Sequence, residues 1–271
     1  SRPNVTVDAS AIAMKAGNAV ILRGGQDSYY TSTKLCKIIN EVFTNQGIPE
    51  HAVQMIPVAD RSAVDEMLQL DSCIDIIIPR GGKGLIEAIK EKSSIPVINH
   101  SDGICHVYVD GDANLNKAKK IVFNSKMRRP GICGAAETLL IQKSIAQTFL
   151  PEISTRLREA GCSLKGDDIA RGIVPEIEIA TEEDWATEYL DSIISIKVVD
   201  GAEAAINHIA HYSSGHTDCI ITEDEATAEA FLACVDSAIV MVNASTQFAD
   251  GGEFGMGAEI GIATGRMHAR G

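Results

Sequence analysis

Short apolar runs alternate with amphipathic segments along the first hundred residues. Four apolar runs bounded by turn residues predict buried strands: residues 19–22, 53–58, 74–78 and 95–98. Three segments with apolar side chains at helical spacing predict helices between them: residues 32–46, 62–70 and 85–92. Alternation of helices with nearly continuous apolar strands is typical of a parallel sheet with helices on both faces.

The same alternation continues after Asp102 and Gly103. Further strands are expected at residues 106–110, 176–180, 193–199, 217–222 and 238–243. Further helices are expected at residues 113–123, 144–160, 202–210 and 226–234. The pattern therefore predicts an α/β protein with two doubly wound domains, residues 1–101 and 102–250. A glycine-rich segment, residues 251–271, would then return towards the first domain.

Composition and charge exclude several classes of protein. Hydrophobic residues make up 45% of the 271 positions, which is enough for a sizeable core. The net charge of −13 argues against binding of a nucleic-acid backbone. With only 4% aromatic residues, stacking platforms for single strands are not expected either. No apolar run approaches the length needed to cross a bilayer.

The seven cysteines are odd in number and include no CxxC pair. This usage fits a reducing cytoplasm and argues against a disulfide framework or a cysteine-rich zinc site, so no metal is expected. The first residues have no secretory character. Because the chain begins with Ser1 rather than methionine and stops abruptly at Gly271, we expect a piece of a longer protein, truncated at both ends.

The segment from Arg128 to Gly134 holds the strongest candidate for chemistry. Cys133 comes after a Pro-Gly turn and two arginines, and small residues come after it. Nearby cations lower the pKa of a thiol, and the thiolate is the nucleophilic form. A Pro-Gly turn also exposes the residues after it. Cys133 is therefore a candidate nucleophile, although most free cysteines are small core residues.

Two glycine loops come after predicted strands of the first domain. One is formed by Arg23, Gly24 and Gly25, and the other begins at Arg80 with Gly81 and Gly82. Ligands of parallel sheets bind at the carboxyl ends of the strands, where both loops lie. Neither loop has a standard phosphate-binding spacing, and each alone is equally well an ordinary strand-to-helix turn. Two such loops with basic residues together favour an anionic nucleotide.

Residues 199–220 resemble the signature of the γ-glutamyl phosphate reductase family, also called glutamate-5-semialdehyde dehydrogenase. Six other blocks agree with that family in the same order: residues 1–8, 18–25, 76–82, 100–106, 128–134 and 243–255. The resemblance covers essentially the whole chain. It implies an aldehyde dehydrogenase-like fold with a nucleotide-binding domain, a catalytic domain and a small oligomerisation hairpin.

The resemblance also assigns roles to individual residues. It implies that Cys133 is the nucleophile and that Arg23 lies where the superfamily places a lysine on the adenine ribose. Gln26 stands where many relatives have a glutamate that would repel a 2′-phosphate, which favours NADPH over NADH. Glu188 matches the glutamate that binds the nicotinamide ribose, although in its acidic stretch it is also readily explained as a solvated carboxylate.

Substrate-binding candidates lie on both sides of the catalytic segment. Arg128 and Arg129 would favour the thiolate or hold the phosphate, or they are a solvated basic pair. By analogy with the family, Ser245 and Thr246 would bind the substrate carboxylate, and without it they are turn residues. The glutamate that activates water in hydrolytic relatives is absent near His100, which suits an enzyme that must not hydrolyse its thioester. His100 and His106 are either acid-base groups or structural histidines.

The implied reaction is the NADPH-dependent reduction of L-glutamyl 5-phosphate to L-glutamate 5-semialdehyde in proline biosynthesis. It would proceed through a cysteine thioester in the cytoplasm. A glutamate 5-kinase is a plausible partner because acyl phosphates are labile, and a homo-oligomer is expected for the full-length protein. Two alternatives stay open. One is another acylating semialdehyde dehydrogenase of the same fold, and the other is a nucleotide-binding or assembly module without turnover.

Overall fold

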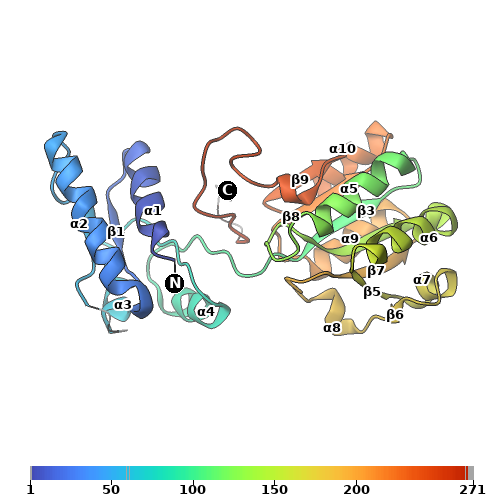
Figure 1. Ribbon diagram of the computed structural model, residues 1–271, viewed down its shortest axis with the longest axis horizontal. Helices are drawn as coiled ribbons and strands as arrows, with labels where there is room; N and C mark the ends of the chain where they lie inside the picture. Colours follow the sequence, from blue (N-terminus) through green and yellow to red (C-terminus); the bar gives the residue numbers. More distant parts are fainter. Residues whose placement is uncertain (1, 59, 61, 266, 268–271) are drawn as a thin grey trace. The chain divides into compact units, whose positions relative to one another are not determined.

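The computed structural model describes residues 2–58, 60, 62–265 and 267. The chain divides into two compact units (Figure 1). The first contains the described residues up to His100 together with Ala258–Gly261, and the second contains Ser101–Gly257 together with the described residues 262–265 and 267. Part of the glycine-rich segment, residue 266 and residues 268–271, lies outside the described residues. Among the described residues, no helix is long and apolar enough to span a membrane.

The first unit is built around a small parallel sheet. Strands β1 (Val20–Leu22) and β2 (Val53–Met55) pair in parallel, with Val20 opposite Val53. The helical elements of this unit are α1 (Asn4–Lys15), η1 (Gln26–Ser28), α2 (Tyr29–Asn45), α3 (Ser62–Met67) and α4 (Lys83–Lys92). The apolar spacing predicted α2 and α4 well, whereas α1 was not predicted.

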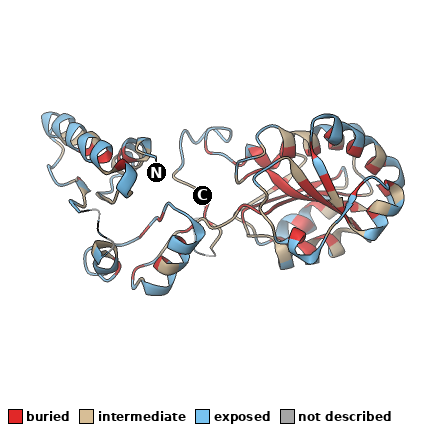
Figure 2. Ribbon diagram, turned by 60° about the horizontal axis from the view of Figure 1, so that its bottom comes forward, coloured by how far each residue is buried: buried red, intermediate tan, exposed pale blue. Residues whose placement is uncertain are grey.

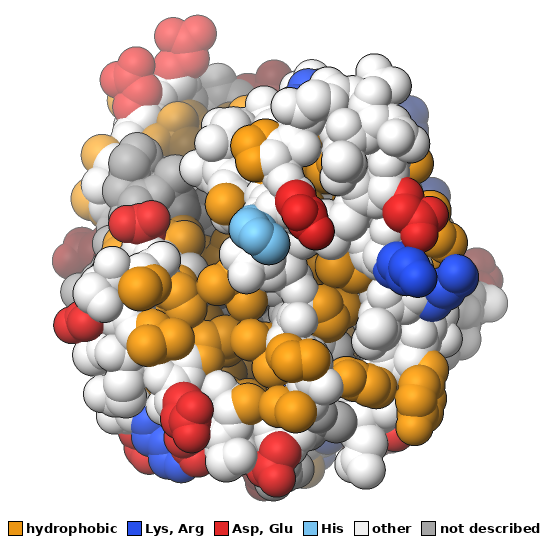
Figure 3. Space-filling model, turned by 90° about the vertical axis from the view of Figure 1, so that its left-hand side faces the viewer, with side chains coloured by type: hydrophobic (Ala, Val, Ile, Leu, Met, Phe, Trp, Pro, Cys, Tyr) orange, Lys and Arg blue, Asp and Glu red, His pale blue; other side chains and the backbone are white. Residues whose placement is uncertain are grey.

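Two predicted strands of the first unit are not extended strands in the structure. Residues 74–78 and 95–98 meet only at one parallel bridge, between Ile77 and Val97. Ile77 and Ile95 are nevertheless buried, in a small core with Leu68 and Ile89. Apolar side chains are exposed elsewhere in this unit, and Figure 3 shows them gathered on one face. Ile76 and Ile78, from the same run as Ile77, are exposed. The two runs therefore predicted burial only for Ile77 and Ile95, and they did not predict the strand pairing.

Within the described residues, the second unit contains a seven-stranded parallel sheet (Figure 1). Its strand order is β6-β5-β7-β4-β3-β8-β9. The strands are β3 (Cys105–Val109), β4 (Ala136–Gln142), β5 (Ser163–Gly166), β6 (Glu178–Ile179), β7 (Ile193–Val199), β8 (Thr217–Ile221) and β9 (Ile239–Val242). The all-parallel ladder confirms the doubly wound α/β fold predicted from the sequence.

Helices cover both faces of this sheet. They are α5 (Leu115–Met127), α6 (Lys143–Glu159), α7 (Asp168–Ile173), α8 (Glu182–Trp185), α9 (Ala202–Tyr212) and α10 (Glu225–Cys234), and a short turn of helix, η2 (Thr246–Phe248), comes after β9. Successive side chains of a strand point to opposite faces. Leu139 therefore packs in the core under α5 and α6, while its neighbour Leu140 packs in the core with α9 and α10. Figure 2 shows the sheet as the buried centre of this unit.

Apart from the short turn η2, the sequence patterns missed four helices and strands among the described residues of the second unit. They are β4, β5, α7 and α8. The strand β4 is buried on both faces, so its apolar residues show no alternation and merge with those of the next element, α6. The other three span only four to six residues, too short for a periodic pattern.

Candidate active site

The candidate site lies at the amino ends of the central strands of the second unit. Because β7, β4, β3 and β8 are parallel neighbours, the segments that precede them meet at one edge of the sheet. These segments carry Glu188, Cys133, Gly103 and His216, respectively. General experience with open α/β sheets points to the carboxyl edge instead. The second unit therefore gathers its candidate chemistry at the opposite edge.

Cys133 is half-buried in the loop between α5 and β4. Its backbone is held from two sides. Gly103 lies against it so closely that a Cβ on Gly103 would be 2.6 Å from the Cα of Cys133. The thiol of Cys105 donates a hydrogen bond to the carbonyl oxygen of Cys133, 3.1 Å away. The backbone of the loop is therefore fixed by the segment that leads into β3, while Cys133 as a residue stays partly exposed.

A fully buried ion pair closes the base of this loop. The ammonium of Lys126, near the end of α5, lies 2.6 Å from the carboxylate of Glu137, in β4. Glu137 also accepts a hydrogen bond from the backbone N–H of Leu190. Burial raises the pKa of Glu137 to about 7, although Lys126 opposes this shift. The pair joins the two ends of the Cys133 loop and links them to the segment before β7.

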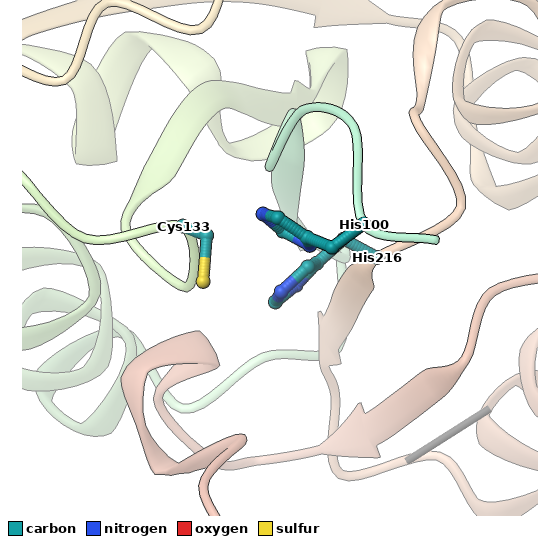
Figure 4. A group of neighbouring side chains, drawn as sticks. All are labelled: His100, Cys133 and His216. Carbon is teal, nitrogen blue, oxygen red and sulfur yellow. The ribbon is translucent and has the colours of Figure 1, made fainter. Parts of the chain in front are cut away.

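His216 is the functional candidate that sequence reasoning missed. Its ring is completely buried and points towards Cys133 (Figure 4), and one ring nitrogen lies within 4.8 Å of the thiol sulfur. The Nδ1 atom is 2.8 Å from the hydroxyl of Thr217 and 3.5 Å from the sulfur of Cys105. The signal was present in the residues 199–220 block that carried the family resemblance, but nothing local separated His216 from the other histidines there.

Of the two histidines considered from the sequence, His106 is a buried core residue that pairs with Asp218. Its Nδ1 lies 2.9 Å from the carboxylate of Asp218, and both side chains are fully buried. Asp218 also accepts hydrogen bonds from the hydroxyls of Ser213 and Ser237 and from the backbone N–H of His106. His106 is therefore a structural histidine. His100 is the last residue of the first unit.

Glu188 is brought to the Cys133 loop by a backbone contact. Its carboxylate accepts a hydrogen bond from the N–H of Gly103, at 2.8 Å. Gly103 is the residue that packs on Cys133, so Glu188 is one residue removed from the candidate nucleophile. This bond rules out the interpretation of Glu188 as a carboxylate bound only by solvent.

The structure gives the two arginines different surroundings. Arg128 pairs with Glu253 and lies over the ring of Phe248, 5.5 Å from its centroid. An arginine held in this way can release its partner when a stronger anion binds, but it is not a freely solvated side chain. Arg129 is an exposed neighbour on the same loop.

Ser245 and Thr246 lie behind the Cys133 loop and are buried. The Ser245 hydroxyl caps η2 by accepting from the Gln247 N–H, and the Thr246 N–H donates to Ser125 in α5. A Cβ on Gly134 would be 3.2 Å from the carbonyl oxygen of Thr246. In this structure the two residues therefore support the loop, whatever part they take in binding substrate.

The two predicted nucleotide-binding loops belong to the first unit, whereas Glu188 lies in the second. Arg23, Gly24 and Gly25 come directly after β1 and lead into η1, as the sequence predicts for the end of a parallel strand. In the second loop, Arg80 donates a hydrogen bond to the carbonyl oxygen of Ile260, at 3.0 Å. Gly81 and Gly82 come next, and Gly82 caps the amino end of α4 with extended backbone.

Comparison with known proteins agrees with this fold. The model of the aldehyde dehydrogenase family matches residues 3–169. A γ-glutamyl phosphate reductase from Methylobacterium radiotolerans is 56% identical over 272 positions, which cover all of this chain and 63% of that protein. One from Parvibaculum lavamentivorans is 55% identical and is covered to 64%. The chain thus spans about 63% of the length of the curated relatives it matches.

A solved structure supports the same relationship. The crystal structure of γ-glutamyl phosphate reductase from Thermotoga maritima superimposes with a TM-score of 0.96 at 48% identity, covering all of this chain and 66% of that one. An acetylating aldehyde dehydrogenase from Geobacillus thermoglucosidasius shares the fold, with a TM-score of 0.66 at 22% identity. The resemblance noted in the sequence is confirmed, and the chain belongs to the aldehyde dehydrogenase family.

Proposed function

We propose that this chain carries the nucleophile and much of the active site of an NADPH-dependent γ-glutamyl phosphate reductase. The proposed enzyme reduces L-glutamyl 5-phosphate to L-glutamate 5-semialdehyde and phosphate. The observation that carries the proposal is the half-buried Cys133 thiol on a clamped loop, in a chain 56% identical to proteins of that name. Identity of this degree over the whole chain favours this reaction over that of other acylating dehydrogenases.

In the proposed reaction, Cys133 acts through its thiolate. The sulfur attacks the acyl carbon, the bond to phosphate breaks, and a thioester joins the substrate to the protein. Bound NADPH would supply the hydride for reduction of this thioester. The resulting thiohemiacetal then collapses to the aldehyde and returns the thiolate of Cys133. Backbone N–H groups beside Cys133 would stabilise the negative charge on the acyl oxygen.

The first unit has residues that fit a nicotinamide nucleotide. Arg23 is the first residue after β1, at the carboxyl end of the strand, where parallel sheets bind ligands. Neither Gly24 nor Gly25 has a side chain that would keep a nucleotide away from the backbone. Arg23 would pair with the 2′-phosphate, and Gln26 adds no negative charge beside it. Gly81 and Gly82 precede the amino end of α4, and the free N–H groups at the amino end of a helix favour phosphate binding. Residues 1–101 would thus be the NADP-binding domain.

Residues 102–250 would be the catalytic domain, with substrate recognition on the Cys133 loop and its support. Arg128 and Arg129 would bind the phosphate of the substrate. Arg128 would then leave its ion pair with Glu253 and pair with the phosphate, which is the stronger anion. Ser245 and Thr246 would act on the substrate carboxylate, and Glu188 would bind the nicotinamide ribose after leaving the Gly103 N–H. A cytoplasmic location, a homo-oligomer and a glutamate 5-kinase partner that supplies the labile acyl phosphate complete the proposal.

The reverse reaction tests this function. Purified protein is incubated with glutamate 5-semialdehyde, NADP and phosphate, and NADPH formation is followed by absorbance. We expect turnover that requires phosphate and disappears in Cys133→Ala. A Cys133→Ala variant that remains folded and active would refute the thioester mechanism. Activity with a different semialdehyde only would assign the chain to another acylating dehydrogenase.

A further inference from the structure

We propose that His216 is the proton-transfer partner of Cys133: its imidazole takes the thiol proton and returns it during the reaction. This role rests on the proposed function and adds to it the group that carries the proton of the nucleophile. Its geometric basis, a buried imidazole beside a half-buried thiol, stands independently of the substrate.

The fold places the two side chains together through adjacent parallel strands. Cys133 precedes β4 and His216 precedes β8, and β3 lies between these strands. The sulfur of Cys133 and a ring nitrogen of His216 are within 4.8 Å of each other. Figure 4 shows the two side chains as neighbours. In an enzyme without its substrate, catalytic hydrogen bonds are often long, and one water molecule also bridges such a distance.

The orientation of the His216 ring is fixed by its own contacts. Thr217 and Cys105 both contact Nδ1, at 2.8 and 3.5 Å. We therefore assign proton exchange with Cys133 to Nε2. The sulfur of Cys105 contacts both the ring of His216 and the carbonyl oxygen of Cys133. One buried thiol thus sets the position of both members of the pair.

Four other titratable groups of the second unit at this edge already have partners: Cys105, Asp218, Glu137 and Glu188. Burial, with the negative charges of Asp218 and Cys133, raises the pKa of Cys105 well above its usual value, so it stays protonated. The carboxylate of Asp218 already has hydrogen-bond partners in His106, Ser213 and Ser237. Glu137 pairs with Lys126, and Glu188 accepts from the Gly103 N–H. His216, by contrast, offers a ring nitrogen within 4.8 Å of the Cys133 sulfur, and we assign it as the base for the thiol.

The proton balance of the proposed reaction gives this imidazole two uses. Before attack, the proton moves from the sulfur of Cys133 to Nε2, which leaves a thiolate and an imidazolium. When the carbon–oxygen bond to phosphate breaks, the imidazolium gives that proton to the departing phosphate. After reduction and collapse, the thiolate of Cys133 recovers a proton from solvent through the same nitrogen. One proton is consumed in each turnover, together with one hydride.

The test measures the thiolate of Cys133 without any substrate, so its outcome does not depend on the proposed function. The rate of alkylation of Cys133 by iodoacetamide is followed against pH by mass spectrometry of its peptide. In the wild-type protein we expect the rate to rise at lower pH than for an ordinary thiol, whose pKa is about 8.5. In His216→Gln the midpoint should move up by about one pH unit or more, because an imidazolium lowers the pKa of a neighbouring thiol.

Matched controls separate this effect from a general loosening of the core. His208 is also buried, but it packs against Trp185 and Tyr212, so His208→Gln should leave the profile of Cys133 unchanged. His100→Gln tests the histidine that was considered from the sequence. An unchanged profile in folded His216→Gln, or a shift seen only in His100→Gln, would overturn the proposal.

A reciprocal measurement keeps the proposal testable if His216→Gln does not fold. Linkage requires that the thiolate raises the pKa of His216 as much as the imidazolium lowers that of Cys133. The His216 ring is followed by nuclear magnetic resonance in the wild-type protein and in Cys133→Ala. We expect its pKa to fall in Cys133→Ala, and an identical titration in the two proteins would refute the pairing.

Discussion

Gly103 packs so tightly on Cys133 that a Cβ at position 103 would be 2.2 Å from the carbonyl oxygen of Cys133. No side chain fits there unless the backbone of the loop moves. We predict that Gly103→Ala displaces the Cys133 loop, destabilises the protein by about 1–3 kcal/mol and lowers activity at least tenfold. Unfolding in urea and the reverse reaction measure the two effects.

Gly172 provides the control for that substitution. It lies within α7, and a Cβ there would meet nothing within 4 Å. Gly172→Ala should therefore leave activity unchanged and stabilise the protein slightly, because alanine favours a helix over glycine. Equal behaviour of the two variants would show that the contact between Gly103 and Cys133 is unimportant.

The buried pair of Lys126 and Glu137 predicts a specific dependence of stability on pH. Burial raises the pKa of Glu137 from 4.5 to about 7, so its contribution to stability is fully present below pH 4.5 and is lost as the pH rises through 7. Relative to Glu137→Gln, the wild-type protein should therefore lose about 3 kcal/mol of unfolding free energy between pH 4.5 and pH 8. Parallel stability curves for the two proteins would contradict this expectation.

Removal of the cation from the same pair should be costly. Lys126→Met leaves a buried carboxylate without its ion pair, and we expect a loss of about 3–5 kcal/mol at pH 8. Lys119 and Glu152 form a pair of the same length, 2.6 Å, on the surface. Lys119→Met should cost less than about 1 kcal/mol, and urea unfolding at one pH compares the two directly.

Glu188 has a structural contact in this structure and a proposed role towards the cofactor. Glu188→Gln keeps an oxygen for the Gly103 N–H, so stability should change by less than about 1 kcal/mol. A neutral amide binds ribose hydroxyls less well than a carboxylate, and we expect the KM for NADP to rise several-fold. Unchanged steady-state kinetics in Glu188→Gln would limit this residue to its bond with Gly103.

Arg23 should determine the choice between the two nicotinamide nucleotides. We predict that Arg23→Gln raises the KM for NADP about tenfold, because it removes a charged hydrogen bond to the 2′-phosphate, and leaves the KM for NAD unchanged. The ratio of kcat/KM for the two cofactors measures the effect. Equal changes for both nucleotides would place Arg23 elsewhere than on the 2′-phosphate.

Particular elements show how far local pattern reaches. The apolar spacing of residues 32–46 predicted α2, and the run at residues 193–199 predicted β7 within its observed bounds. The run at residues 74–78 failed as a strand because a strand needs a partner along its length, and the structure provides only the bridge from Ile77 to Val97. In β4 the reverse occurred: burial on both faces removed the alternation that identifies a strand.

In the candidate site, too, one residue could be predicted from local sequence and another could not. The turn chemistry and the family blocks pointed to Cys133 as a single residue, because the reactivity of a thiol depends on its immediate neighbours. His216 lies 83 positions further along the chain (216 minus 133) and gives no local sign of a connection with Cys133. Only the order of the parallel strands brings the two side chains together.

The sequence by itself determined the α/β class, most helices and strands of the second unit, and the family, because these depend on local periodicity and on long matching blocks. The tertiary structure alone decided that the candidate chemistry gathers at the amino edge of the sheet. It also decided that Arg128 and Glu188 already have protein partners, and that Gly103 and Cys105 hold the backbone of Cys133. The reason is physical: strand order and register set distances between residues far apart in the chain, and no local pattern encodes them.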